Sequence, residues 1–284
     1  MTTNTPRIGN FTSSEIFKLM TVAKDQKSFG KPALTYIEEK NMERRLQRSL
    51  TTEISSRPTS WGNLVELQAF NLLGIDYKIS STETIRHPDI DFWAGSPDCE
   101  KFDEGKTVID LKCPLTLKSF CTLADCKTTD ELRENHSDGE KFYWQLVSNA
   151  ILTNSKFAEL IVYVPYLSEL EAIKDLASNF DGNQNKIAWI GFAEDKDLPY
   201  LIEGKDMHYK NLNIIRFEIP EADKKALTEK VIEAGKLLDK IKKPVKTKSA
   251  PPTEEQKFSA QEKIKLMKEL TNRIKANRYL STEA

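Results

Sequence analysis

The sequence predicts an α/β protein in which helices flank a central mixed β-sheet. Segments with helical spacing alternate with short β-rich segments along most of the chain, which is typical of layered α/β folds. The run 160–164 is short and β-branched, as expected of a strand buried inside a sheet. The 284 residues are 39% hydrophobic, which is enough for a large core and excludes a wholly disordered chain.

The helices are expected where apolar spacing and end signals coincide. The first should begin near Ser13, because Thr12 and Glu15 have the spacing of a capping box and apolar residues follow with helical periodicity. Further helices are expected from Pro32 toward Arg48, from Ser60 to Gly74, and over 142–152, 169–177 and 221–240. Strands are expected at 77–79, 90–94, 107–111, 160–164, 187–192 and 213–217.

The chain is expected to divide into three parts. Residues 1–241 form the main domain, and residues 242–256 form a basic linker that contains proline and lysine. Residues 257–284 are predicted to end in an amphipathic helix. Its apolar positions are Phe258, Ile264, Met267, Leu270 and Ile274.

The formal net charge of −1 conceals an asymmetry along the chain. Residues 221–284 carry 16 Lys and Arg against 10 Asp and Glu, so a basic tail follows a body with an excess of acidic residues. An acidic body suits a site that concentrates divalent cations better than a surface that wraps DNA. Ordinary solvated surface is the alternative for both regions.

Several classes of protein are excluded or disfavoured by simple counts. The four cysteines lack the close pairs of a zinc or iron–sulfur site, and this size disfavours a disulfide framework, which indicates a reducing cytoplasm. No apolar stretch is long enough to cross a membrane, and residues 1–6 lack a signal-peptide core. No nucleotide-binding glycine motif occurs.

The residues that indicate chemistry lie at 95–98 and 108–112. Asp98 follows a Gly-Ser-Pro turn, and Asp110 precedes Lys112 by two positions in a predicted strand. Because side chains alternate along a strand, Asp110 and Lys112 should share one face while Leu111 points to the core. Two clustered carboxylates favour Mg²⁺ or Mn²⁺. Taken alone, this spacing is also typical of a surface ion pair.

The order of the surrounding motifs is more specific. Ser14-Glu15 is followed by Trp61 to Glu66, Ser96 to Asp98, Asp110 to Pro114 and an aromatic-rich helix that carries Gln145. This series resembles the lambda-type phage exonucleases, or YqaJ-like viral recombinases, of the PD-(D/E)XK nuclease superfamily. The resemblance covers about residues 7–220. It implies a restriction-endonuclease-like core in residues 1–241, with a helical C-terminal extension.

The resemblance implies a role for each residue of the motif. Two Mg²⁺ ions, with Mn²⁺ as a substitute, would be held by Glu66, Asp98, Asp110 and the backbone carbonyl of Leu111. Lys112 would orient the attacking water, and Gln145 would fix the geometry of the site. If the three carboxylates act together, a structure should bring them within metal-bridging distance.

The resemblance also implies a pocket for a terminal 5′-phosphate. Its residues would be Arg7, Ser14, Ser96 and Lys118. A helix N-terminus at Ser14 and a bidentate fork at Arg7 suit an anion. Lys118 falls where the best-known member of the family has an arginine, and a lysine lacks the bidentate fork. Thr59 lies where the family can place an apolar wedge that splits the duplex end, so the resemblance does not extend to the handling of blunt ends. The plainer alternatives are a flexible charge at Arg7 and a cap at Ser14.

We therefore expect a Mg²⁺-dependent 5′→3′ exonuclease. It would degrade one strand of linear double-stranded DNA and leave 3′ single strands for annealing-type recombination. The family resemblance further implies that the chain forms a ring-shaped trimer. It also implies a single-strand annealing protein as a partner. Two alternatives remain: a structure-specific or repair endonuclease with the same site, and a catalytically silent DNA-end-binding recombination protein.

Overall fold

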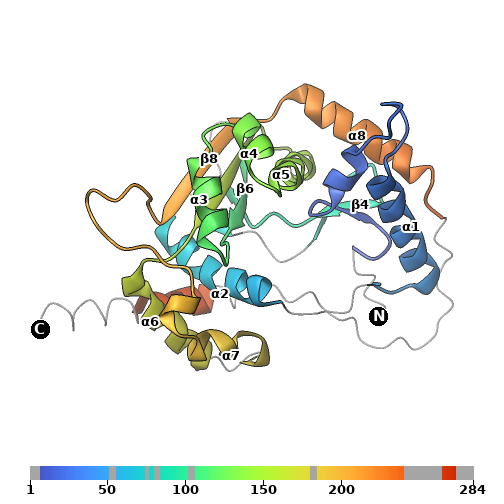
Figure 1. Cartoon of the computed structure of the whole chain (residues 1–284). Helices are drawn as coiled ribbons and strands as arrows, with labels where there is room; N and C mark the ends of the chain where they lie inside the picture. The colour runs from blue at the N-terminus through green and yellow to red at the C-terminus, as the bar shows by residue number, and fades with distance from the viewer. Residues whose placement is uncertain are drawn as a thin grey trace, which may run out of the picture.

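The computed structural model describes residues 7–50, 56–73, 77–79, 84–101, 106–179, 184–239 and 264–272. A five-stranded sheet lies at the centre, in the order β2-β5-β6-β7-β8 (Figure 1). Its strands are β2 (Tyr77–Ile79), β5 (Cys99–Lys101), β6 (Thr107–Lys112), β7 (Phe157–Tyr163) and β8 (Leu212–Glu218). Strands β6 and β7 are parallel and the other neighbours are antiparallel, so the predicted mixed sheet is confirmed.

A second, three-stranded sheet has the order β1-β4-β3. Its strands are β1 (Phe11–Thr12), β4 (Trp93–Gly95) and β3 (Ile85–Arg86). It lies against helix α5, and a Cβ atom on Gly95 would stand 2.7 Å from Asn149 Oδ1 and 2.1 Å from Ser13 Oγ. Only glycine fits this close approach of strand to helix.

The helices cover both faces of the central sheet. They are η1 (Ile16–Met20), α1 (Lys31–Leu46), α2 (Arg57–Leu72), α3 (Leu117–Asp125), α4 (Thr129–Asn135), α5 (Gly139–Thr153), α6 (Leu167–Ser178), α7 (Gln184–Phe192), η2 (Asp195–Asp197) and α8 (Glu221–Gly235). Figure 1 shows α2, α6 and α7 grouped on one side of the molecule, and α5 with α8 on the other. The layered α/β architecture is therefore as predicted.

The alternation of side chains along the central strands builds two cores. Val108 of β6 and Leu160 of β7 pack in one apolar cluster with α1, α5 and α8. Ile109, Leu111 and Ile161 point the other way and pack in a second cluster with α2, α6 and α7. Burial on both faces requires near-continuous apolar strands, which is why the run 160–164 is recognisable from the sequence.

The predicted strand at 187–192 is wrong, because these residues lie in helix α7. Ile187 and Ile190, three positions apart, are both buried against the α2 and α6 cluster. A Cβ atom on Gly191 would stand 2.0 Å from Ser178 Oγ of α6, so the glycine serves close helix packing. A short apolar run fits both the two-residue repeat of a strand and the 3.6-residue repeat of a helix. Here tertiary packing favours the helix.

The capped α-helix expected at Ser13 is also wrong. Residues 16–20 form a short 3₁₀ helix whose N-cap is Glu15, without a side-chain cap. Ser13 continues the pairing of β1 instead, since its N–H donates to the carbonyl of Ala94 at 3.0 Å. Its hydroxyl is engaged with Ser148 Oγ at 2.8 Å.

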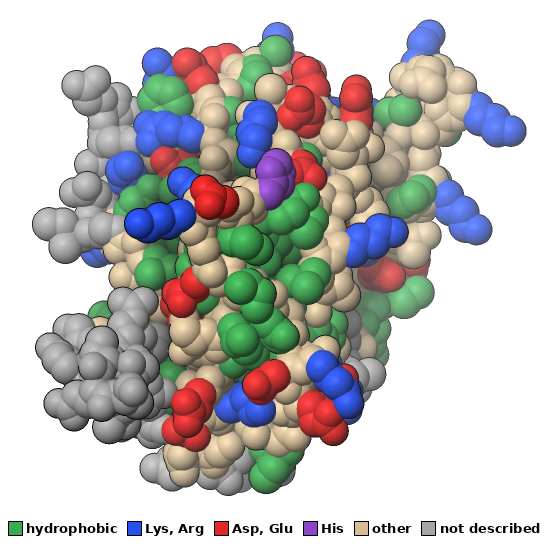
Figure 2. Space-filling model, turned by 60° about the vertical axis from the view of Figure 1, so that its left-hand side comes forward, with side chains coloured by type: hydrophobic (Ala, Val, Ile, Leu, Met, Phe, Trp, Pro, Cys, Tyr) green, Lys and Arg blue, Asp and Glu red, His purple; other side chains and the backbone are tan. Residues whose placement is uncertain are grey.

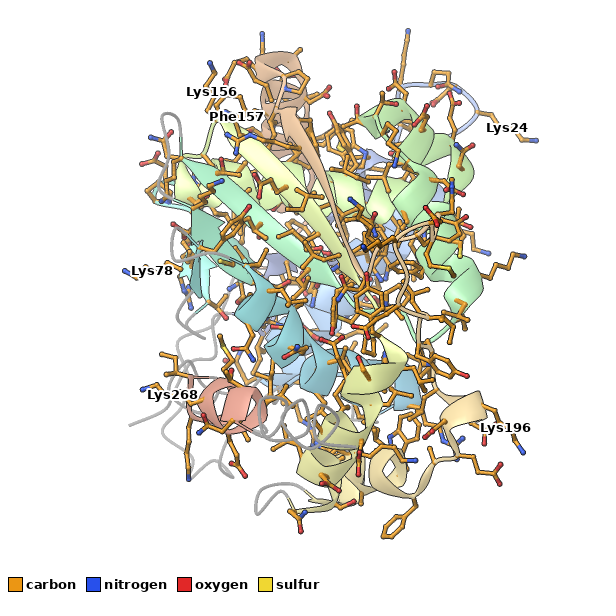
Figure 3. The ribbon with its side chains drawn as sticks, turned by 90° about the vertical axis from the view of Figure 1, so that its left-hand side faces the viewer. Lys24, Lys78, Lys156, Phe157, Lys196 and Lys268 are labelled. Carbon is orange, nitrogen blue, oxygen red and sulfur yellow. The ribbon has the colours of Figure 1, made fainter. Side chains whose placement is uncertain are left out.

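The C-terminal amphipathic helix is confirmed in part, over residues 264–272. Leu266 and Leu270 are buried in the α2 and α6 cluster, and Asn71 of α2 donates to the carbonyl of Met267 at 3.3 Å. Ile264, expected on the apolar face, is exposed. In Figure 3, the Lys268 side chain points away from the body. The predicted linker 242–256 and the positions Phe258 and Ile274 lie outside the described residues.

No helix within the described ranges is both long and apolar enough to cross a membrane.

Candidate active site

The candidate site is organised by the antiparallel pair β5 and β6. Cys99 pairs with Ile109, so the register places Asp98 opposite Asp110. The Asp98 N–H donates to the carbonyl of Ile109 at 3.3 Å, and the Leu111 N–H donates to Asp98 Oδ2 at 3.0 Å. The two carboxylates predicted to act together are therefore neighbours across one strand pair.

Asp110 is fully buried and is held by side chains from two elements. Gln145 of α5 donates from Nε2 to Asp110 Oδ1 at 2.7 Å. Lys112 Nζ forms an ion pair with Asp110 Oδ2 and lies 5.0 Å from the centre of the Phe142 ring. The prediction that Asp110 and Lys112 share a face, with Leu111 in the core, is confirmed.

Glu66 approaches from helix α2, on the other side of the sheet. It is buried, and Gly62 one turn earlier faces the carbonyl of Cys113, the residue that follows Lys112. Burial and the nearby carboxylates of Glu66 and Asp98 raise the pKa of the Cys113 thiol well above its ordinary value. The thiol therefore stays protonated at neutral pH, and Glu66 and Asp98 both lie near the end of β6.

The expected convergence of three carboxylates at metal-bridging distance is not met. Within the part of the chain that the structure describes, no three His, Cys, Asp or Glu side chains form a group that could hold a metal ion. Asp98 and Asp110 are instead turned toward donors of the protein itself, namely the Leu111 N–H, Lys112 and Gln145. The predicted site residues therefore lie together near the end of β6, but their side chains are not arranged to bind a metal ion.

A second polar cluster is formed by Arg7, Thr84 and Ser96. Arg7 donates from Nη2 to Ser96 Oγ at 3.0 Å and from Nε to Thr84 Oγ1 at 3.3 Å. Burial lowers the pKa of Arg7, and the negative charge of Asp98 opposes this shift. Arg7 therefore lies close enough to feel the charge of a candidate catalytic carboxylate.

The other two residues of the predicted phosphate pocket make their hydrogen bonds elsewhere. Ser14 Oγ lies 3.5 Å from Thr12 Oγ1. Lys118 is exposed on α3, where its carbonyl accepts from Thr122 Oγ1 at 2.9 Å. Thr59, at the predicted wedge position, is an exposed residue of the first turn of α2.

Sequence reasoning missed two participants in these clusters. Phe142 lies on the predicted helix that carries Gln145, but nothing in the sequence indicates that its ring contacts Lys112. Thr84 lies in a polar stretch, where a single threonine gives no signal, and only the pairing of β3 with β4 brings it to Ser96. The neighbouring Tyr143 and Trp144 are buried in the core.

The surface does not present one large charged field on the face that Figure 2 shows. Hydrophobic side chains gather in the middle of this face, and basic and acidic side chains are mixed around them.

The fold can be compared with that of known proteins. No protein-family model and no curated protein matches this sequence. Among solved structures, the alkaline exonuclease LHK-Exo from Laribacter hongkongensis is 18% identical with a TM-score of 0.50, covering 81% of this chain and 89% of that chain. Its complex with dAMP gives the same values.

A phage-related exonuclease from Haemophilus somnus 129PT is 17% identical, with a TM-score of 0.53. The match covers 80% of this chain and 92% of that chain. The chain therefore shares its α/β fold with these two exonucleases, as the predicted fold class requires.

Proposed function

We propose that this protein is an exonuclease that hydrolyses phosphodiester bonds of DNA. The observation that carries the proposal is the cluster of Asp98, Asp110, Lys112 and Gln145 at one strand end. Buried carboxylates beside a lysine are uncommon unless they serve chemistry or fold stability. The similarity in fold to the two exonucleases supports the first of these roles.

The protein's own residues divide the work of the proposed reaction. Gln145 holds one oxygen of Asp110, so the carboxylate keeps its orientation when Lys112 leaves it. Lys112, held between Asp110 and the Phe142 ring, would then bind and orient the attacking water with its ammonium group. Burial excludes bulk water from Asp110 and strengthens these electrostatic interactions.

The donor set fits Mg²⁺ by its chemistry. Glu66, Asp98 and Asp110 supply hard carboxylate oxygens, the Leu111 carbonyl would be the fourth ligand, and the neighbouring Cys113 thiol is kept protonated. Because these side chains are not arranged as a metal-binding group, their rotamers would have to turn to bind the ions. When bound, two Mg²⁺, with Mn²⁺ as a substitute, would supply charge stabilisation for phosphodiester hydrolysis.

The proposal also specifies the DNA substrate and the direction in which it is degraded. Arg7, oriented by its hydrogen bond to Ser96, would hold a terminal 5′-phosphate close to Asp98, which would give 5′→3′ degradation of one strand of linear double-stranded DNA. Lys118 and Ser14 would complete the pocket after side-chain movement.

The remaining 3′ single strand suits annealing-type recombination, with a single-strand annealing protein as partner. A ring trimer and a cytoplasmic location complete the proposal.

A digestion of matched DNA substrates tests it. In Mg²⁺, linear duplex with 5′-phosphates should be shortened, while a covalently closed circle of the same sequence should persist. Cutting of the circle would favour the endonuclease alternative. End binding without cleavage of either substrate would favour the catalytically silent alternative.

Lys112→Ala should lower the rate of digestion of the linear duplex about 10²–10⁴-fold. Lys156→Ala is a matched control, because Lys156 is an exposed lysine that Figure 3 shows pointing outward beside Phe157. Equal digestion by the two variants would contradict the role given to Lys112.

A further inference from the structure

The small sheet places two hydroxyl side chains opposite each other beside Arg7. Ile85 of β3 pairs with Gly95 of β4, so one step beyond this register Thr84 faces Ser96. Their hydroxyl oxygens are 3.3 Å apart, and both contact the Arg7 guanidinium. Thr84 is thus as much a part of this cluster as Ser96, although only Ser96 belongs to the family motif.

The directions of these hydrogen bonds follow from what each group can donate. Arg7 has only donors, so Thr84 Oγ1 and Ser96 Oγ both accept from it. Ser96 has a single hydroxyl proton, and it donates this proton to Thr84 Oγ1. Thr84 Oγ1 then accepts from both Arg7 and Ser96, which uses both of its lone pairs and directs its own proton away from the pair.

This arrangement forms a donor chain that starts at a charged group. It runs from the Arg7 guanidinium through Ser96 to Thr84, and such chains polarise each member and strengthen the last donor. A hydroxyl that accepts from a guanidinium is a strong donor to an anion. The group suited to receive it is a phosphate oxygen, which Arg7 would neutralise at the same time.

We propose that Thr84 is a further phosphate-contacting residue of the 5′-end pocket, and that Ser96 acts mainly by relaying the donor chain to it. The proposal rests on the proposed function for the identity of the ligand, a 5′-phosphorylated DNA end. It assigns preference for a 5′-phosphate over a 5′-hydroxyl end to the Thr84 hydroxyl together with Arg7.

The test measures binding rather than cleavage. Fluorescently labelled duplex with a 5′-phosphate is bound to the full chain in EDTA, and unlabelled duplexes with 5′-phosphate or 5′-hydroxyl ends compete. Thr84→Val removes the hydroxyl and keeps the shape, while Thr84→Ser restores the hydroxyl. Thr228→Val is the matched control, because the Thr228 hydroxyl donates to Lys224 within α8.

The unaltered chain and the Thr228→Val variant should prefer the 5′-phosphate end. Thr84→Val should lose about tenfold or more of that preference, as expected for one hydrogen bond to a charged group, and Thr84→Ser should keep most of it. Unchanged preference in Thr84→Val would overturn the proposal, and so would equal binding of both ends by the unaltered chain. Thermal unfolding checks that each variant folds, and Thr84→Ala replaces the valine variant if it does not.

The same samples separate this inference from the proposed function. Loss of phosphate preference in Thr84→Val, combined with no digestion by the unaltered chain in Mg²⁺, would support the pocket and refute the nuclease. Digestion from the end, combined with unchanged phosphate preference in Thr84→Val, would support the nuclease and refute the phosphate contact of Thr84.

Discussion

Two sets of buried carboxylates in this molecule differ in what holds them. Glu169, at the start of α6, accepts from Gln68 Nε2 at 2.7 Å, from Tyr163 OH at 2.9 Å and from the Tyr166 N–H at 2.8 Å. All these donors are neutral and are fixed by a helix, a strand or the backbone. Asp110, by contrast, is shared between one amide and a lysine whose side chain is 22% exposed.

The two kinds of partner suit the carboxylates to different roles, one in stabilising the fold and the other in chemistry. A carboxylate whose oxygens are filled by rigid neutral donors is tied to one arrangement, as Glu169 is by elements far apart in sequence. A carboxylate whose partner is a solvent-accessible lysine can exchange that partner for a ligand.

Removing the lysine of the exchangeable pair should have the largest effect on activity. Lys112→Ala should lower the rate of DNA digestion about 10²–10⁴-fold, because the water would lose its positioning cation. Its unfolding free energy, measured by urea denaturation, should fall by less than that of Glu169→Leu, because water can reach the place left by a lysine side chain that is 22% exposed. A large loss of stability with proportionate loss of activity would place Lys112 in the structural set instead.

Removing the fixed carboxylate should have the opposite result. Glu169→Leu leaves three donors without their acceptor, two of them on the buried side chains of Gln68 and Tyr163, and should cost about 3 kcal/mol or more of unfolding free energy, measured by urea denaturation. Below the unfolding transition, its digestion rate should match that of the unaltered chain. A fall in rate comparable to that of Lys112→Ala would erase the distinction between the two sets.

A single donor of the fixed set should contribute less. Tyr163→Phe removes one hydrogen bond to Glu169 and should cost about 1.5 kcal/mol of unfolding free energy. The same substitution made in Glu169→Leu should cost much less, because the acceptor is already gone. Equal costs in both backgrounds would show that the hydrogen bond is not the source of the effect.

The smallest expected effect concerns pH and His136, which stacks on the ring of Phe142. The Asp138 N–H donates to His136 Nδ1 and burial lowers the pKa of His136, so the folded protein favours the neutral ring. The unfolded chain takes up its proton at higher pH, near the ordinary value of about 6.5. The contribution of His136 to stability is therefore complete above this pH and falls as pH decreases toward the lowered pKa of the folded state.

Urea denaturation at a series of pH values checks this dependence. The unaltered chain should lose more stability than His136→Gln as pH falls through this range. Parallel pH curves for the two proteins would contradict it.

The sequence was most informative where periodicity and chemistry coincide. Alternation along β6 was enough to predict that Asp110 and Lys112 share a face, and β-branched composition was enough to predict β7. It was uninformative where distant pairing decides the outcome. The helical state of 187–192 depends on packing against α2 and α6, and the contact of Thr84 with Ser96 depends on the pairing of β3 with β4.

The arrangement of the carboxylates could not be predicted from motif spacing. The motif residues Glu66, Asp98 and Asp110 are all buried near the end of β6, but they do not converge as a metal-binding group. Their side-chain orientations depend on local donors, such as the Leu111 N–H and Gln145, that spacing does not encode.

Release of labelled nucleotide from a linear duplex tests the central claim most directly. The duplex carries a radioactive 5′-phosphate on one strand and a fluorescent 3′ end on the same strand, and is incubated with Mg²⁺. The account predicts that the unaltered chain releases the 5′ label first, that EDTA prevents release, and that Asp110→Asn releases neither label. Release by Asp110→Asn at the rate of the unaltered chain, or release of the 3′ label first, would contradict it.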